Sequence, residues 1–492
     1  MEKTHKNIIT SLLLRIITII CGFIIPKLII SNYGSNVNGL VSSISQFLGY
    51  IVLLEAGFGP IIKSLLFKPI VKNDKETIER ILKSSERIFR KISYIFIIYI
   101  IVLCVIYPFI TREYNFLYTI SLIIIISIST FFEYFFGMTF KLFLQADQKH
   151  YVSHIVEIIT LIFNTILVVI LVKAGASIQL VKLVSAIIFV FRPIINNIYV
   201  KKKYNINLKD VDDNYEIKQK WDALAQHVSY VIHNNTDVVV ITLCLGLKEV
   251  SVYAIYLLII NSLKSIVNSF IGGVDSSFGK LIVKGENKEL NKRFNMFIIK
   301  YFTLATIVFV STLFLIIPFV KLYLSGVKDA NYIRPLFAYI MIISKFILTL
   351  KEPYYDLVKV AGHFKQTKKG AILEAVINVV LSFALVFKFG IVGVAIGTLV
   401  SVFIRTIEIM YYSSKNILKI DFIKTIRKLI VIIIEFIILY VTLSSIESIK
   451  IDNYFDWIMY AFNVLVASTI IVSIINFIAG KIFRRIDGGF YE

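Results

Sequence analysis

The chain has 492 residues, of which 57% are apolar, and its mean hydropathy is +0.80. Soluble proteins use about 45–50% apolar residues, so this composition excludes a set of soluble domains and indicates a polytopic membrane protein. A net charge of +21 raises the question of nucleic-acid binding. In so apolar a chain, membrane topology explains the charge better if the basic residues gather on one side.

The apolar segments, bounded by charged or turn residues, predict an all-α fold of about 14 transmembrane helices. The first six are predicted at residues 8–30, 37–66, 92–110, 116–140, 152–172 and 178–200. The next six are predicted at residues 223–245, 250–274, 296–319, 332–352, 370–387 and 391–412. Two more follow at residues 426–445 and 457–480. Pro60 is expected to kink the second helix, because proline removes a backbone hydrogen bond.

The basic residues are divided unequally between the connecting segments. If the N-terminus is cytoplasmic, 36 of the 53 lie in cytoplasmic segments and eight lie outside. This asymmetry predicts that both termini are cytoplasmic, and it removes nucleic acid as an expected partner. All connecting segments are too short for a soluble catalytic domain.

An internal repeat is visible in the sequence. Short patterns in residues 146–192 recur in residues 361–405 at offsets of 213 to 216 residues. Six helices per repeat give both halves the same orientation, the parallel-repeat arrangement of some transporters. The predicted parts are a six-helix bundle at 1–200, a cytoplasmic linker at 201–221, a second bundle at 222–412 and two additional helices at 426–480.

Ionisable residues inside membrane helices are costly and commonly functional. Arg15 lies near the middle of the first helix and Lys264 lies within the eighth. Two such cations facing a cavity suit an anionic substrate such as a diphosphate, because arginine offers a planar fork and lysine a point charge. Weaker candidates for this role are Lys63, Arg192, Lys345 and Arg405. For the last three, snorkelling toward the helix ends is the alternative.

Other polar residues share these helices. The side chains expected to line the cavity are Glu55, His227, Asn234, Asn261 and Asn268. Interhelical hydrogen bonding is the alternative role for them. A coupling-ion site is predicted at Asp237, Glu374, Asn378 and Thr398. Oxygen ligands suit Na⁺, a buried carboxylate suits a proton relay, and an ordinary polar contact is the alternative. No other cofactor and no firm metal site is predicted.

Five motifs together resemble the Wzx-type polysaccharide flippases of the multidrug/oligosaccharidyl-lipid/polysaccharide (MOP) exporter superfamily. The motifs lie at residues 38–43, 53–59, 144–151, 234–237 and 361–367. The resemblance implies two six-helix bundles forming a V, alternating access, and flipping of polyprenyl-diphosphate-linked oligosaccharide across the bacterial cell membrane. The similar peptidoglycan-precursor flippases include members with a Na⁺ site between helices seven, eleven and twelve. The predicted coupling residues lie on those helices.

Two other functions are compatible with the sequence. A drug or small-cation exporter of the same superfamily would have a cavity dominated by carboxylates and aromatic residues. A membrane glycosyltransferase, polymerase or ligase acting on the same glycans would need acid and base residues in a substantial outside loop, and the predicted outside loops are short. The expected partners of a flippase are its lipid-linked oligosaccharide, membrane lipid and a glycan polymerase or ligase.

Overall fold

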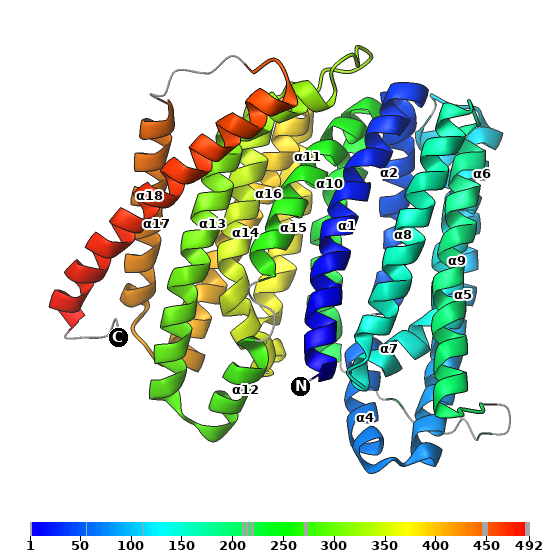
Figure 1. Ribbon diagram of the computed structural model, residues 1–492, viewed down its shortest axis with the longest axis horizontal. Coiled ribbons are helices and arrows are strands. Elements are labelled where there is room, and N and C mark those ends of the chain that lie inside the picture. The colour runs from blue at the N-terminus through cyan, green and yellow to red at the C-terminus, as the bar shows by residue number, and fades with distance from the viewer. Residues whose placement is uncertain are drawn as a thin grey trace. The chain divides into compact units, whose positions relative to one another are not determined.

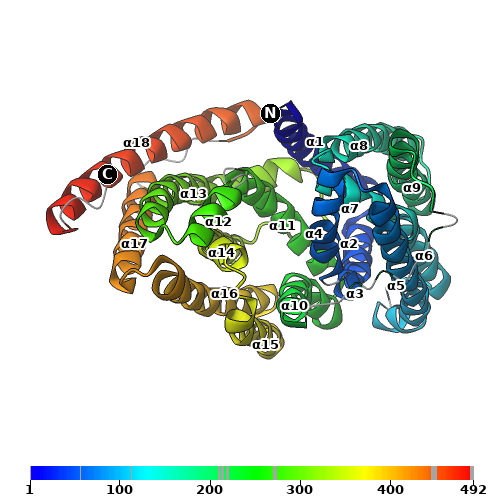
Figure 2. The same cartoon turned by 90° about the horizontal axis from the view of Figure 1, so that it is seen from below.

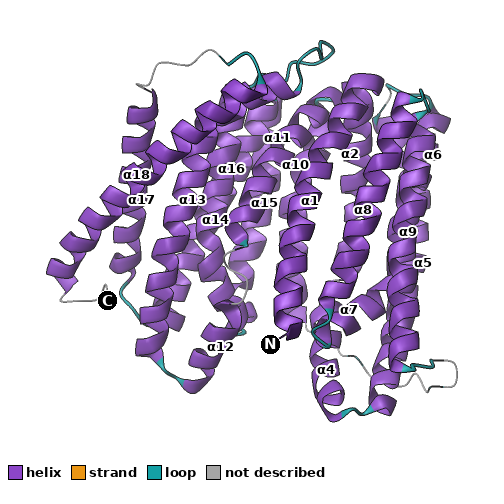
Figure 3. Ribbon diagram, in the orientation of Figure 1, coloured by secondary structure: helices purple, strands orange, loops and turns teal. Residues whose placement is uncertain are grey.

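The computed structural model describes residues 2–55, 57–111, 113–208, 211, 215, 217, 221–269, 274–444 and 451–487. Within these ranges every regular element is a helix (Figure 3). Eleven of the described helical segments are long and apolar enough to span a membrane. The predicted all-α polytopic class is therefore confirmed, and the count of 14 spans stays a prediction.

Packing divides the chain into two compact units, Met1–Ala254 and Ile255–Glu492 (Figure 1). The first unit contains α1 (Glu2–Tyr33), α2 (Ser35–Gly49), α3 (Val52–Glu55), α4 (Phe58–Lys72), α5 (Lys75–Ile110), α6 (Phe116–Phe132), the π-helical turn η1 (Glu133–Gly137), α7 (Met138–Ala146), α8 (His150–Lys173), α9 (Ile178–Tyr204), α10 (Trp221–Cys244) and the beginning of α11 (Leu247–Asn268). In both views α8 and α9 lie side by side along this unit (Figure 2).

The second unit contains the rest of α11 and the helices that follow it. These are α12 (Val274–Lys284), α13 (Asn287–Tyr323), α14 (Pro335–Val360), α15 (Phe364–Phe389), α16 (Ile391–Ser413), the π-helical turn η2 (Ser414–Leu418), α17 (Phe422–Ser444) and α18 (Tyr454–Asp487). The helix α16 packs against both α14 and α15, and α13 packs against α14, α17 and α18.

The first unit extends past the predicted end of the first bundle, because α10 and the start of α11 pack on α2. The hydroxyls of Ser43 and Thr242 lie 2.7 Å apart, and the Asn38 amide donates to Ser251 Oγ at 2.8 Å. The division into two related six-helix repeats stays a prediction.

The predicted second helix is broken in the structure. It begins as α2, which ends at Gly49, and continues as the short α3 and then α4. The break before α4 lies at Gly57, whose φ of +90° suits glycine. The expected kink at Pro60 was wrong, because Pro60 falls in the first turn of α4, where no helical hydrogen bond is lost.

Several helices extend beyond the apolar segments that predicted them. The helix α5 begins at Lys75 and α14 continues to Val360, because polar residues carry both helices past the apolar stretch. Asp74 caps α5 by accepting hydrogen bonds from the Thr77 N–H at 3.1 Å and its hydroxyl at 2.6 Å. These bonds favour the carboxylate and lower the pKa of Asp74.

Close packing of α2 against the start of α11 depends on a glycine. A Cβ added at Gly39 would lie 1.8 Å from the carbonyl oxygen of Leu247. We expect Gly39→Ala to lower the stability of the first unit by about 1–3 kcal/mol, the usual range for overpacking. Thermal unfolding in detergent measures this loss. Gly49→Ala, on the same helix, is the control, because its Cβ would meet only Asn235 at 3.6 Å. Equal midpoints for the two variants would contradict this account of the packing.

Candidate functional site

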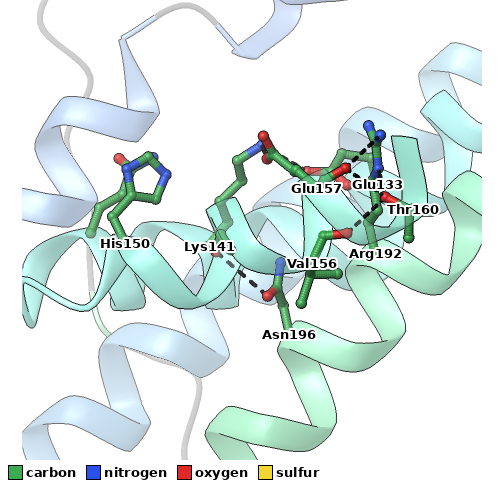
Figure 4. Close-up of polar contacts among 10 residues, drawn as sticks. Glu133, Lys141, His150, Val156, Glu157, Thr160, Arg192 and Asn196 are labelled. Carbon is green, nitrogen blue, oxygen red and sulfur yellow. Dashed lines mark hydrogen bonds and ion pairs between the residues drawn. The ribbon is translucent and has the colours of Figure 1, made fainter. Parts of the chain in front are cut away.

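Within the first unit, charged side chains from three helical elements meet (Figure 4). The Lys141 ammonium lies 3.5 Å from Glu133 Oε1 and 3.1 Å from Glu157 Oε1. Beside them, Arg192 Nε donates to Thr160 Oγ1 at 2.7 Å. We call these five residues the N-terminal cluster. Its two carboxylates balance its two cations.

The local fold explains how Glu133 and Arg192 come together. Glu133 opens η1, and π-helical turns of this kind are frequent at functional sites. At the other end of η1, a Cβ on Gly137 would lie 2.5 Å from the Cβ of Pro193. The glycine therefore lets η1 approach α9 closely, next to the residue that carries the guanidinium.

Two predicted cations lie in the same region. Arg15 of α1 lies near His154, and Lys63 of α4 lies near His150. The two imidazole rings lie 4.1 Å apart on α8. Arg15 and Lys63 are both half-buried. Three of the predicted cations therefore lie around α8. They are Arg15, Lys63 and Arg192, and Arg192 contacts Thr160 of α8 within the N-terminal cluster.

Two of the predicted cavity residues of the first unit also lie near this cluster. Glu55 of α3 accepts a hydrogen bond from the Tyr134 hydroxyl at 2.9 Å. His227 and Lys141 both lie near its carboxylate. The side chain of Asn234 lies outside the described residues.

The second unit contains a larger set of ion pairs. The Glu374 carboxylate accepts from Lys351 Nζ at 2.9 Å and lies 3.7 Å from Arg405 Nε. Arg405 also donates to Glu408 Oε2 at 2.7 Å. Lys264 Nζ lies 2.6 Å from Glu352 Oε1. We call these six residues the C-terminal cluster.

Two sequence interpretations change with this geometry. Arg405 is only 3% exposed and ion-paired within α16, so snorkelling does not explain it. Lys351 was counted among the cytoplasmic basic residues, yet its ammonium is buried between helices because α14 continues for more than two turns beyond it. Lys345 is also largely buried on α14.

Two predicted cavity residues lie on α11 with Lys264. Asn268 accepts a hydrogen bond from the Tyr301 hydroxyl at 2.8 Å, and Tyr301 lies near Glu352. Asn268 is therefore linked to the C-terminal cluster. The side chain of Asn261 is exposed.

The predicted coupling residues are only partly brought together. The Asn378 amide donates to Thr398 Oγ1 at 2.9 Å. Glu374, one turn before Asn378, carries two protein cations as neighbours. Asp237 belongs to the first unit and accepts from the Tyr253 hydroxyl at 2.8 Å. A Na⁺ or proton site formed by all four residues stays a prediction.

Sequence reasoning missed Lys141, Lys351, Glu352 and Glu408 as site residues. The predicted helices ended at residues 140 and 352, which placed the first three at or beyond a helix end. The spacing of Glu133 and Lys141, eight residues apart, could have indicated a shared helix face across about two turns. The π-helical turn between them could not be read from the sequence.

We expect loss of the Lys141 ammonium to destabilise the first unit, because Glu133 and Glu157 would both lose the cation with which they pair. Their side chains are 26% and 22% exposed, so the loss for Lys141→Ala should be about 1–3 kcal/mol, below that of a fully buried pair. Chemical or thermal unfolding in detergent measures it. Arg80→Ala removes an exposed ion pair with Glu76 and should change stability by less than about 1 kcal/mol. A similar effect of both substitutions would argue against a stabilising role for the cluster.

Comparison with known proteins identifies the fold. No family model and no curated protein sequence matches the chain. Among solved structures, the lipid II flippase MurJ in an inward closed conformation matches with a TM-score of 0.67 and 15% identity, over 97% of this chain and 98% of that chain. An inward-facing multidrug resistance MATE family transporter of the MOP superfamily matches with a TM-score of 0.59 and 16% identity, over 84% and 99%.

The eukaryotic MATE transporter AtDTX14 matches with a TM-score of 0.56 and 13% identity, over 83% of this chain and 94% of that chain. At these identities the likeness concerns the fold. The chain is a multi-pass membrane protein with the fold of MOP superfamily transporters. Its structural neighbours are a lipid flippase and multidrug transporters.

Proposed function

We propose that this protein is a flippase of the Wzx type. It moves polyprenyl-diphosphate-linked oligosaccharide from the inner to the outer leaflet of the bacterial cell membrane by alternating access, with both termini in the cytoplasm. The observation that carries the proposal is the presence of lysine and arginine side chains within the membrane helices of each unit, in a fold that matches a lipid II flippase along nearly its whole length.

The physical reason is the nature of the substrate. A diphosphate and a sugar chain cannot cross hydrocarbon without a polar route, whereas the polyprenyl tail can remain in the lipid. Arg15 lies on α1, whose most apolar window is only 6% buried within the structure. The planar guanidinium of Arg15 suits the oxygens of a diphosphate.

The ion pairs of the clusters suggest how the cations are kept in place without substrate. Each cluster cation that forms an ion pair is held by a glutamate, and a diphosphate could replace that carboxylate with oxygens that bind arginine or lysine at least as well. For Lys264, the partner to be displaced is Glu352. The carboxylates would then recover their cations when the substrate leaves.

A drug or small-cation exporter is the second candidate, and the MATE neighbours favour it. A cation exporter needs carboxylates available to its substrate. Glu374 already has two cationic neighbours, and Glu133 and Glu157 share Lys141. A cationic substrate would therefore have to displace these lysine and arginine side chains. A membrane enzyme acting on the same glycans remains the third candidate.

Deletion of the gene distinguishes these functions in cells. A flippase predicts that lipid-linked oligosaccharide accumulates on the inner leaflet and that surface polysaccharide is lost, with unchanged sensitivity to cationic drugs. An exporter predicts normal polysaccharide and greater drug sensitivity. A polymerase or ligase predicts that oligosaccharide reaches the outer leaflet with an altered chain length or without transfer to its acceptor. Either of the last two results would overturn the proposal.

A further inference from the structure

A cavity of about 80 Å³ lies inside the second unit, lined by α13, α17 and α18. These three helices pack against one another, and they lie side by side in Figure 2. The walls are mainly apolar. The polar side chains that line the cavity are Thr303, Lys428, Glu435 and Asn476. Since α17 and α18 follow the predicted repeats, this cavity belongs to neither charge cluster.

Glu435 is the unusual member of this set. Its side chain is 1% exposed, and its Oε1 atom has no hydrogen-bond partner among the residues that the structure describes. Thr306 of α13 lies beside it, is fully buried, and also has an unpartnered hydroxyl in the described part of the chain. A buried carboxylate with an unsatisfied oxygen is costly, so a positive charge at this place would stabilise the fold.

Lys428 does not neutralise Glu435 directly. The two residues are seven positions apart on α17, which separates their Cα atoms by about 10 Å along the helix axis. Side chains on a helix lean toward its N-terminus, so that of Lys428 leans away from the deeper Glu435. No ion pair joins them in the described structure. Lys428 is the other titratable side chain that lines the cavity, since α13 and α18 contribute no ionisable residue to it.

The remaining groups offer oxygen atoms. The Asn476 side chain lies beside Glu435, and its Nδ2 donates to Thr303 Oγ1 at 3.0 Å, which leaves its carbonyl oxygen available. One carboxylate with neutral hydroxyl and amide oxygens matches the charge of a monovalent cation better than that of a divalent one. One water needs about 10–15 Å³ of such space, so the cavity could hold a small cation with several waters.

We propose that this cavity binds a monovalent cation, either a proton or Na⁺, with Glu435 as the neutralising carboxylate. Asn476 supplies a supporting oxygen from the cavity wall, and Thr306 supplies one from behind the wall, beside Glu435. A proton would convert Glu435 into a donor for the neighbouring oxygens, and Na⁺ would be coordinated by them. Its use as the coupling ion of transport rests on the proposed function. Binding itself does not, and it is therefore tested without transport.

The test is the thermal unfolding midpoint of the full chain in lipid nanodiscs. One series replaces choline with Na⁺ at constant pH and ionic strength, and the other lowers the pH in choline. Binding of Na⁺ predicts a rise of the wild-type midpoint in the first series, and binding of a proton predicts a rise relative to Glu435→Gln in the second. Glu435→Gln should abolish the dependence, whereas Glu289→Gln, at an exposed ion pair on α13, should retain it.

The proposal is overturned if neither series separates wild type from Glu435→Gln. If that variant does not fold, Thr306→Val provides the second test, because it removes one oxygen and keeps the carboxylate. It should raise the Na⁺ concentration needed for the same shift by about tenfold or more. In the proton case, it should shift the pH at which the infrared carbonyl band of the protonated carboxyl appears. An unchanged response would contradict the site, even if translocation of the lipid-linked substrate were confirmed.

Discussion

Replacing Lys351 with alanine is expected to destabilise the second unit by about 3–5 kcal/mol, the loss typical of a buried ion pair that loses one partner. The Lys351 and Glu374 side chains are only 10% and 12% exposed, and their charged atoms lie 2.9 Å apart. Without the ammonium, Glu374 would lose its nearest cation, since Arg405 lies at 3.7 Å and is shared with Glu408. The measurement is the unfolding free energy or the thermal midpoint in detergent.

A double substitution tests whether the loss comes from the unpaired charge. Lys351→Met combined with Glu374→Leu removes both charges and retains apolar volume, so it should recover most of the stability. Lys321→Ala, at an exposed lysine near the end of α13, should have little effect. If Lys351→Ala were as stable as wild type, or the double variant were no better than the single one, the buried pair would not have the role assigned here.

The second large effect concerns transport. Arg15→Ala should abolish export of the lipid-linked glycan while leaving expression and folding intact. Loss of one charged partner of a bound anion costs about 2–5 kcal/mol, which corresponds to at least about a thirtyfold decrease in affinity. Export is measured as surface polysaccharide in a deletion strain that expresses the variant at the wild-type level.

Two variants make this prediction specific. Arg15→Lys keeps the charge but loses the planar fork, so it should restore only part of the activity. Lys27→Ala, on the same helix but closer to its end, should export normally, because we expect Lys27 to extend toward the interface. Undiminished export by Arg15→Ala would contradict the assignment of Arg15 to the diphosphate.

Many of the helices could be predicted from the length of the apolar segments and from the charged residues that bound them. The segment predicted at 391–412 is α16, and that at 152–172 is α8 with two residues added at the start and one at the end. The second helix departs from prediction because the backbone is left-handed at Gly57, a conformation that glycine permits but does not require. The start of α5 and the end of α14 differ from the predicted bounds because charged residues continue both helices beyond the apolar segments.

The site was predicted less completely than the fold, for a related reason. Arg15, Lys264 and Arg405 could be found because a charge in an apolar segment is conspicuous. Their partners were harder to identify. Glu352, the partner of Lys264, lay at a predicted helix end, and Glu408 gains a role only once its ion pair with Arg405 is seen in the structure. Pairing depends on which helix faces meet, and the sequence of one chain does not specify these.

Translocation of a labelled polyprenyl-diphosphate oligosaccharide in proteoliposomes tests the central proposal most directly. The protein should make the oligosaccharide on the inner leaflet accessible to an external glycosidase, without changing its chain length, and Arg15→Ala should reduce the rate to that of protein-free liposomes. If folded wild-type protein left the leaflet distribution unchanged, or if it altered the chain length, the flippase proposal would be contradicted.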